Sequence, residues 1–224
     1  MINFKHSGAT GDLIFSLPTI RAMGGGDLYI FPYDIQRALS IAPLIRLQPY
    51  INKCFVTDEI PEDCVNLDKF RETAGHHTNL IRCHLKAQGL TDESWTDGWL
   101  TLPQTDAYIN HTFSVINTGQ NYCDPNFDWK KEVDYLLSIS EKVYYLGYES
   151  EFNELQSKFN TGAEFFDCEF KVAAELIEKA VMFTGGYSAL STIAMGLGRR
   201  YRLVQAPGHT CSSLLMERET IVNL

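Results

Sequence analysis

The chain alternates short runs of β-branched and aromatic residues with stretches of helical, amphipathic periodicity, and this alternation restricts the fold most. It starts with a strand expected at residues 2–6, a helix at 11–23 and a strand at 27–31. Such alternation is typical of parallel sheets with crossover helices. We therefore predict an α/β fold. Further strands are expected at 53–56, 65–67, 114–117, 142–147, 181–185 and 201–205, and further helices at 34–45, 71–88, 128–138, 149–159, 170–179 and 188–197.

The region 89–111 lacks a clear period and is rich in Thr, Asp, Gly and Pro, as expected of a linker or lid. We place a domain boundary there, which gives an N-terminal domain at 1–108 and a C-terminal domain at 109–224. Each half is long enough for a small doubly wound unit. Ligands of such units bind where strand ends meet helix starts, so we expect two Rossmann-like domains that face each other across a cleft holding the site.

Charge and composition exclude several classes of protein. The 224 residues carry 19 Lys and Arg against 28 Asp and Glu, a net charge of −9, which disfavours a phosphate backbone as partner. Five cations of the N-terminal half are candidates for contacting DNA, but only if they share one face: Lys53, Lys69, Arg71, Arg82 and Lys86. No stretch reaches the roughly 18 apolar residues of a transmembrane segment, and no signal-peptide layout is present. We expect a cytoplasmic protein.

The six cysteines are scattered singly, without the C-x-x-C spacing of zinc ribbons and redox motifs. Free thiols in a reducing compartment are the simpler interpretation. His76, His77, Cys83 and His84 form the one cluster that suggests a metal site. That cluster has no second half, so we expect no bound metal.

The first loop that suggests chemistry is S-G-A-T-G-D, residues 7–12, between the first strand and helix. Gly8 and Gly11 let the backbone approach a ligand closely, and the amides of a helix start favour negative charge. The loop is neither a Walker A motif nor a complete dinucleotide fingerprint. Asp12 has an ordinary alternative role, because an acidic residue in the first turn stabilises a helix by about 0.3–1 kcal/mol.

A second loop follows the expected strand at 181–185. Gly185 and Gly186 make a turn, and Ser188 opens the next helix. The Ser188 hydroxyl and the amides of Ala189 and Leu190 could hold a diphosphate. The alternative is that Ser188 only caps the helix.

The string G-A-T-G-D-L-I-F-S-L-P, from Gly8, resembles the N-terminal motif of the family 9 glycosyltransferases, the ADP-heptose:lipopolysaccharide heptosyltransferases and their relatives. In that family the Asp after the second Gly is taken as the catalytic base, which implies this role for Asp12. The later string F-T-G-G-Y-S-A-L-S-T-I-A-M-G-L-G-R-R resembles the family's donor-side unit. It departs from that unit at Gly186, Tyr187 and Ala189.

Two segments between these loops extend the resemblance, which covers residues 1–23 and about 113–207. The strand expected at 114–117 is followed by a small-residue loop at Thr118 and then by D-W-K-K-E. These segments are similar to a strand, a loop and a K-x-W-P-x-E segment in the family. The diphosphate-neutralising role of the family's Lys would pass to Lys130 or Lys131. Glu151 is the closest positional match to a family Glu that contacts the donor ribose.

The resemblance implies a short, divergent glycosyltransferase of the two-Rossmann, GT-B type. It would move a hexosyl, heptosyl or pentosyl group from a nucleotide-diphosphate donor to a hydroxyl, with inversion and without an obligatory metal or other cofactor. The acceptor could be a saccharide, a small metabolite, a protein or a hydroxylated DNA base, and acting as acceptor is the only role left to nucleic acid. The alternative is a non-catalytic nucleotide or nucleotide-sugar binder with a decayed site. A dinucleotide-dependent oxidoreductase has weaker support, because Asp27 lies near the required distance from Gly8 but the third Gly is missing.

Overall fold

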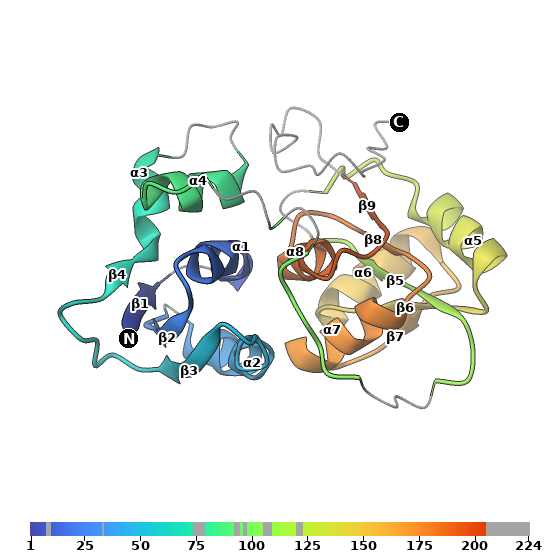
Figure 1. Ribbon diagram of the computed structural model, residues 1–224. Helices are drawn as coiled ribbons and strands as arrows, with labels where there is room; N and C mark the ends of the chain where they lie inside the picture. Colours follow the sequence, from blue (N-terminus) through green and yellow to red (C-terminus); the bar gives the residue numbers. More distant parts are fainter. Residues whose placement is uncertain are drawn as a thin grey trace. The chain divides into compact units, whose positions relative to one another are not determined.

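The computed structural model describes residues 1–7, 10–32, 34–73, 79–91, 95, 98–104, 109–119 and 123–204. The chain divides into two compact units, of which the first comprises Met1–Pro103 and the second begins at Gln104. Each unit has its own parallel sheet (Figure 1).

The first unit is a four-stranded parallel sheet in the order β3-β2-β1-β4. Its strands are β1 Ile2–His6, β2 Gly26–Ile30, β3 Ile51–Val56 and β4 Val65–Asn66, and its helices are α1 Thr10–Ala22, α2 Ile35–Ile45, the 3₁₀ turn η1 Leu67–Lys69, α3 Phe70–Thr73 and α4 Leu80–Ala87. Helix α1 packs against α4 and α2. Its residues 13–20 are all buried, which places Leu13, Ile14, Phe15, Leu17 and Ile20 in the core. The strand order reverses between β1 and β4.

The second unit is a five-stranded parallel sheet in the order β7-β6-β5-β8-β9. Its strands are β5 Phe113–Asn117, β6 Lys142–Tyr145, β7 Glu164–Phe165, β8 Phe183–Gly185 and β9 Tyr201–Leu203, and its helices are α5 Trp129–Ile139, α6 Glu149–Phe159, α7 Phe170–Lys179 and α8 Ala189–Gly196. All five residues of β5 are buried, as expected of a central parallel strand covered on both faces. The strand order reverses between β5 and β8.

The predicted α/β class is confirmed, and the alternation of strands and helices follows the predicted order. The single helix expected at 71–88 is wrong. Helix α3 is described over Phe70–Thr73, and α4 begins at Leu80 after the non-helical Asn79, whose side chain accepts hydrogen bonds from the amides of Ile81 and Arg82. An asparagine that caps a helix start in this way also marks its boundary. Strand β7, two residues long, was not expected.

The described part of the chain contains five of the six cysteines. None of them forms a disulfide bond, and they are Cys54, Cys64, Cys83, Cys123 and Cys168. Cys211 lies outside the described residues. Within the described ranges, no helix combines the length and the apolar character that crossing a bilayer requires.

Candidate functional site

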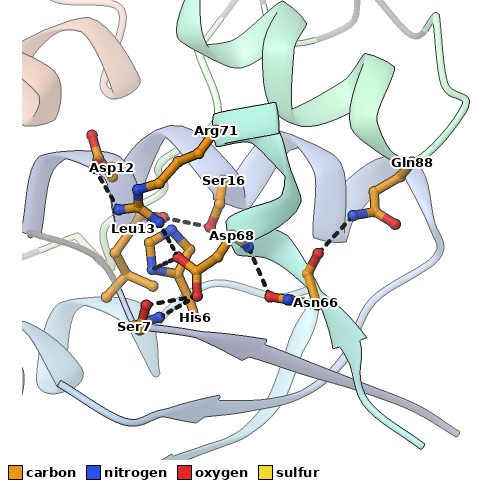
Figure 2. Close-up of polar contacts among 9 residues, drawn as sticks. All are labelled: His6, Ser7, Asp12, Leu13, Ser16, Asn66, Asp68, Arg71 and Gln88. Atoms are coloured by element: carbon orange, nitrogen blue, oxygen red, sulfur yellow. Dashed lines mark hydrogen bonds and ion pairs between the residues drawn. The ribbon is translucent and has the colours of Figure 1, made fainter. Parts of the chain in front are cut away.

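The first candidate site lies at the carboxyl end of β1, beside β4, where the strand order of the first sheet reverses. Ligands of open α/β sheets bind at such reversal points. Strand β1 leads to Ser7, and α1 begins at Thr10 with Gly11 and Asp12 in its first turn. Strand β4 leads through η1 into α3, which brings Asp68 and Arg71 to the same place (Figure 2). Gly8 lies outside the described residues.

Arg71 bridges two carboxylates, as Figure 2 shows. Its Nη2 lies 3.2 Å from Asp12 Oδ2, and its Nη1 contacts Asp68 Oδ1. The other oxygen of Asp68 accepts hydrogen bonds from the Ser7 amide at 2.9 Å and the Ser7 hydroxyl at 2.7 Å. The Asn66 side chain accepts from the Asp68 amide at 3.0 Å and so fixes the turn that carries Asp68. The loop after β1 and the turn after β4 are therefore joined by one polar network.

The two carboxyl groups of this network have opposite pKa shifts. Burial raises the pKa of Asp12 by more than the Arg71 cation lowers it, although 29% of its side chain is exposed. Burial also raises the pKa of Asp68, but His6, the Ser7 hydrogen bonds and Arg71 outweigh it, so the net shift is downward. Asp68 therefore serves as the fixed anion of the pair. Asp12 is the more basic carboxylate and is open to solvent.

Behind Asp68 lies a cluster of three rings from three elements: His6 of β1, Phe70 of α3 and His84 of α4. Phe70 stacks on His84 with ring centroids 4.0 Å apart, and His6 lies 5.9 Å from His84. Burial lowers the pKa of His6 to about 4, although Asp68, 3.8 Å from its Nδ1, opposes the shift. Burial likewise lowers the pKa of His84 well below its usual value. Both rings are therefore neutral near pH 7.

The ring cluster and the polar network beside it contain residues that the sequence analysis interpreted otherwise or did not name. Of the suspected metal cluster, His84 packs in the ring cluster, whereas His76 and His77 lie outside the described residues. Among the residues with described positions, no group of three His, Cys, Asp or Glu side chains could hold a metal ion. Sequence reasoning missed Asp68 entirely. It named Arg71 only as one of several scattered cations.

The second candidate site lies at the carboxyl end of β5, beside β8, where the second sheet reverses. The Gly186 amide donates to the Asn117 carbonyl at 3.1 Å. A Cβ at Gly185 would lie 2.7 Å from the Asn117 carbonyl oxygen, and one at Gly186 would lie 2.5 Å from that of Thr118. Both glycines are thus explained by the close approach of the two loops, and contact of either with a ligand stays a prediction.

Ser188 is the N-cap of α8. The Ser191 amide donates to its hydroxyl at 3.3 Å, and the Ser188 amide donates to the Ser191 hydroxyl at 3.0 Å, which completes a capping box. Ala189 and Leu190 form the first turn of α8. Binding of a diphosphate by Ser188, Ala189 and Leu190 stays a prediction.

A cavity of about 150 Å³ opens beside this second site, between the start of α5 and helix α6. Thr118 and Glu151, which were predicted from separate segments, both line it, together with apolar side chains that include Trp129, Leu155 and Phe159. Lys130 is paired elsewhere, because its Nζ lies 2.5 Å from both carboxylate oxygens of Asp134. Its proposed role at a diphosphate would require it to leave that pair.

No protein-family model and no curated protein sequence matches this chain. Solved structures do match its fold. The chain aligns over its full length with 91% of the E. coli ADP-heptose LPS heptosyltransferase II, at a TM-score of 0.63 and 11% identity. A family 9 glycosyltransferase from Veillonella parvula aligns with 99% of the chain over 85% of its own length, at a TM-score of 0.66 and 10% identity.

A third similar structure is TibC of E. coli, a dodecameric, iron-containing heptosyltransferase solved with ADP-D-beta-D-heptose. It aligns with 98% of the chain over 61% of its own length, at a TM-score of 0.62 and 15% identity. The predicted fold is therefore confirmed. The chain has the GT-B fold of the family 9 heptosyltransferases.

Proposed function

We propose that this protein is a glycosyltransferase that moves a sugar from a nucleoside-diphosphate donor to a hydroxyl group. The observation that carries the proposal is the position of Asp12. This carboxyl group, with a raised pKa, stands at the reversal point of the first sheet in a chain with the heptosyltransferase fold. A general base acts best when its pKa approaches the working pH. Burial moves Asp12 in that direction.

In the proposed reaction, Asp12 takes the proton of the acceptor hydroxyl while the hydroxyl oxygen attacks the anomeric carbon. The bond from that carbon to the diphosphate oxygen breaks, and the diphosphate leaves with the bonding electron pair. Attack opposite the leaving group inverts the anomeric configuration. The amides of Ala189 and Leu190 at the start of α8 would stabilise the departing charge, assisted by Lys130 or Lys131. The proposed mechanism requires no metal, which is tested by transfer in EDTA.

The cavity beside α6 is the proposed seat of the donor nucleoside. Thr118 and Glu151 line it with oxygen atoms, and Trp129, Leu155 and Phe159 provide an apolar wall. ADP is the natural first probe, because TibC was solved with ADP-D-beta-D-heptose. A panel of nucleoside diphosphates and their sugars would then identify the base. Acceptors to be tried are saccharides and DNA that contains a hydroxylated base.

The direct test compares Asp12→Asn with the unchanged protein. The variant should bind the donor nucleotide as before but lose transfer by roughly 10²–10⁴-fold, the usual contribution of a general base. Asp34→Asn is the matched control. Asp34 caps α2 by accepting from the amides of Gln36 and Arg37, and asparagine caps a helix equally well. Transfer by Asp12→Asn at the control rate would contradict the proposal.

The pH profile gives a second readout of the same proposal. Only the ionised carboxylate can take a proton, so kcat/KM should fall as the pH falls through the pKa of Asp12. Arg71 lowers that pKa, so Arg71→Gln should move the acid limb to higher pH. An unchanged limb would remove Asp12 from the role of base.

A non-catalytic binder is the second candidate, and two observations favour it. Tyr187 stands where the resembled family carries an Asp, and the Ser188 hydroxyl is committed to the cap of α8. Nucleotide binding without turnover of any donor, including its slow hydrolysis, would support this candidate over the transferase.

A further inference from the structure

Within the part of the chain that the structure describes, helices cover only one face of the first sheet. Strands β1, β2 and β3 are neighbours in the sheet, so right-handed connections place α1 and α2 on the same face (Figure 1). Helix α4 packs on α1, and its His84 ring lies beside His6, so it belongs to this side as well. Parallel sheets are normally covered on both faces. The opposite face, called the open face below, therefore lacks a layer.

The burial of alternate residues shows which side chains the open face carries. Phe4 and Leu28 are fully buried on the helix-covered side. Lys5 and Tyr29 point the other way and are only partly buried. Phe55 lies beside Tyr29 in the register of β3 and is 37% exposed. The two rings stack with centroids 4.9 Å apart, so the open face presents an aromatic pair to solvent.

The outer strands β1 and β3 carry opposite charges at their two ends. On β1, Lys5 stands toward the carboxyl end, and Asp63 lies beside the amino end, where it accepts from Asn3 Nδ2 at 3.3 Å. On β3 the order is reversed, because Lys53 stands toward the amino end and Glu59 follows the carboxyl end. Among the described residues, neither lysine has an acidic partner in an ion pair. Both cations are therefore available to another molecule.

Strand β2 completes a pattern that is complementary to itself. Asp27 lies in register with Lys53, and Tyr29 lies in register with Phe55. A two-fold axis across the strands turns each strand of a second copy end for end above its counterpart. It sets each cation or hydroxyl of one copy against a carboxylate of the other: Lys5 against Asp63, Lys53 against Glu59, and Tyr29 against Asp27. A two-fold axis along β2 would instead set Asp27 against Asp27, which like charges disfavour.

A cavity beside β3 has room for one of these pairs. It has a volume of about 460 Å³, and Tyr29, Phe55, Thr57 and Glu59 are among the residues that line it. The aliphatic part of a lysine packs well on apolar surface while its ammonium stays polar, and the ammonium is attracted to aromatic faces. The Lys53 side chain of a second copy can therefore cross the aromatic pair and reach Glu59.

We propose that two copies of this chain associate through the open face, sheet against sheet, about a two-fold axis across the strands. This inference goes beyond the proposed function and uses no residue of either candidate site. Three strands of five residues span roughly 15 Å by 16 Å, well below the area of about 800 Å² per partner in a standard interface. We therefore expect a weak dimer, with a Kd on the order of 10 μM.

The experiment is sedimentation equilibrium of the full chain between about 1 and about 300 μM, a range that brackets the expected Kd. The average mass should rise with concentration from one chain toward two. High salt should weaken the dimer, because its charge pairs are open to solvent at their edges.

Exchange of two charges tests the orientation of the copies. Lys53→Glu and Glu59→Lys should each raise the Kd at least about tenfold, because each substitution sets like charges together at two symmetric places. The double variant Lys53→Glu/Glu59→Lys restores opposite charges and should return the Kd to that of the unchanged protein. Both side chains are exposed, so the variants keep the fold.

The matched control is Lys86→Glu. Lys86 is exposed on α4, on the helix-covered side, and this substitution changes the net charge as much as Lys53→Glu does. It should leave the Kd unchanged, whereas an effect of net charge alone would weaken the dimer in both variants.

Three results would overturn the inference. The first is a mass of one chain throughout the concentration range at low salt. The second is a dimer that neither single variant weakens, which would place the contact on another surface. The third is a double variant no tighter than the single ones, which would exclude the pairing of Lys53 with Glu59. Transfer activity is measured separately, so the proposed function stands in all three cases.

Discussion

Glu132 is a buried acid whose two oxygens reach two different strands. It lies in the first turn of α5 with 6% of its side chain exposed. Its Oε1 accepts from the Thr184 hydroxyl at 2.9 Å, and its Oε2 lies 2.5 Å from Arg202 Nη1. The Arg202 guanidinium also lies over the Tyr135 ring, 5.0 Å from its centroid. One carboxylate therefore holds α5 against β8 and β9, the strands next to the donor-side loop.

We predict that Glu132→Ala lowers the free energy of unfolding by about 3 kcal/mol, because removing one partner of a buried ion pair leaves the other charge uncompensated. Lys130→Ala is the control on the same helix. Its pair with Asp134 is exposed, and such pairs contribute about 0–1 kcal/mol. Urea unfolding of both variants checks the prediction. An equal loss of unfolding free energy in the two variants would show that the buried contacts of Glu132 add no stability.

Residues also differ in how well the sequence reveals their roles. Asp12, Thr118 and Glu151 each follow the end of an expected strand, so strand-end rules and the family resemblance identify them. Arg71 does not, since 59 residues separate it from Asp12 and no spacing rule connects them. Only the pairing of β4 with β1 brings them together, and strand order cannot be deduced from hydrophobic periodicity.

At the scale of elements, the first unit contains a contact that depends on pH. Strand β1, α3 and α4 meet through His6, Phe70 and His84, and burial holds the pKa of His6 at about 4 and lowers that of His84. In the unfolded chain a histidine takes up a proton near pH 6.5. The contribution of these two histidines to the free energy of unfolding is therefore fully present above that pH, and it is lost as the pH falls toward 4.

We predict that the free energy of unfolding of the first unit falls between pH 7 and pH 5, by up to about 1.4 kcal/mol per pH unit for each histidine once the pH is below 6.5. His84→Phe removes one titrating ring and keeps a ring to stack on Phe70, so its unfolding should depend less on pH. The raised pKa of Asp12 increases the free energy of unfolding as the pH falls, which is opposite to the effect of the histidines. This increase is the same in the unchanged protein and in His84→Phe, so it cancels when the two are compared. Urea titrations at several pH values check this. The same slope in both proteins would show that His84 does not resist protonation.

The boundaries of elements were predicted less well than their order. Helical periodicity continues from residue 71 to 88, so the pattern alone suggests one helix. The Asn79 side chain accepts hydrogen bonds from the amides of Ile81 and Arg82 and so begins α4 as a separate helix. Strand β7 is too short for a period-two pattern to be recognised. Competition by local side-chain hydrogen bonds explains the first error, and short length explains the second.

At the scale of the whole molecule, both units follow one rule. Each is a parallel sheet whose strand order reverses beside its first strand, and each candidate site lies at that reversal. The alternation of strands and helices predicts this architecture. The chain divides between Pro103 and Gln104, inside the aperiodic region 89–111. The assignment of the acceptor to the first unit and of the nucleotide sugar to the second stays a prediction that needs its own test.

Hydrogen exchange with and without ADP provides that test. A ligand at 100 times its Kd stabilises the unit that binds it by about 2.7 kcal/mol. The amides of β5, β6 and α6 should therefore exchange more slowly, because Thr118 directly follows β5, Tyr145 ends β6 and Glu151 lies in α6. Each unit buries a core of its own, such as the cluster of Val133, Leu136 and Val143 in the second, so β1 and α1 should be affected less. Protection confined to β1 and α1 would reverse the assignment, since ADP would then bind beside Asp12.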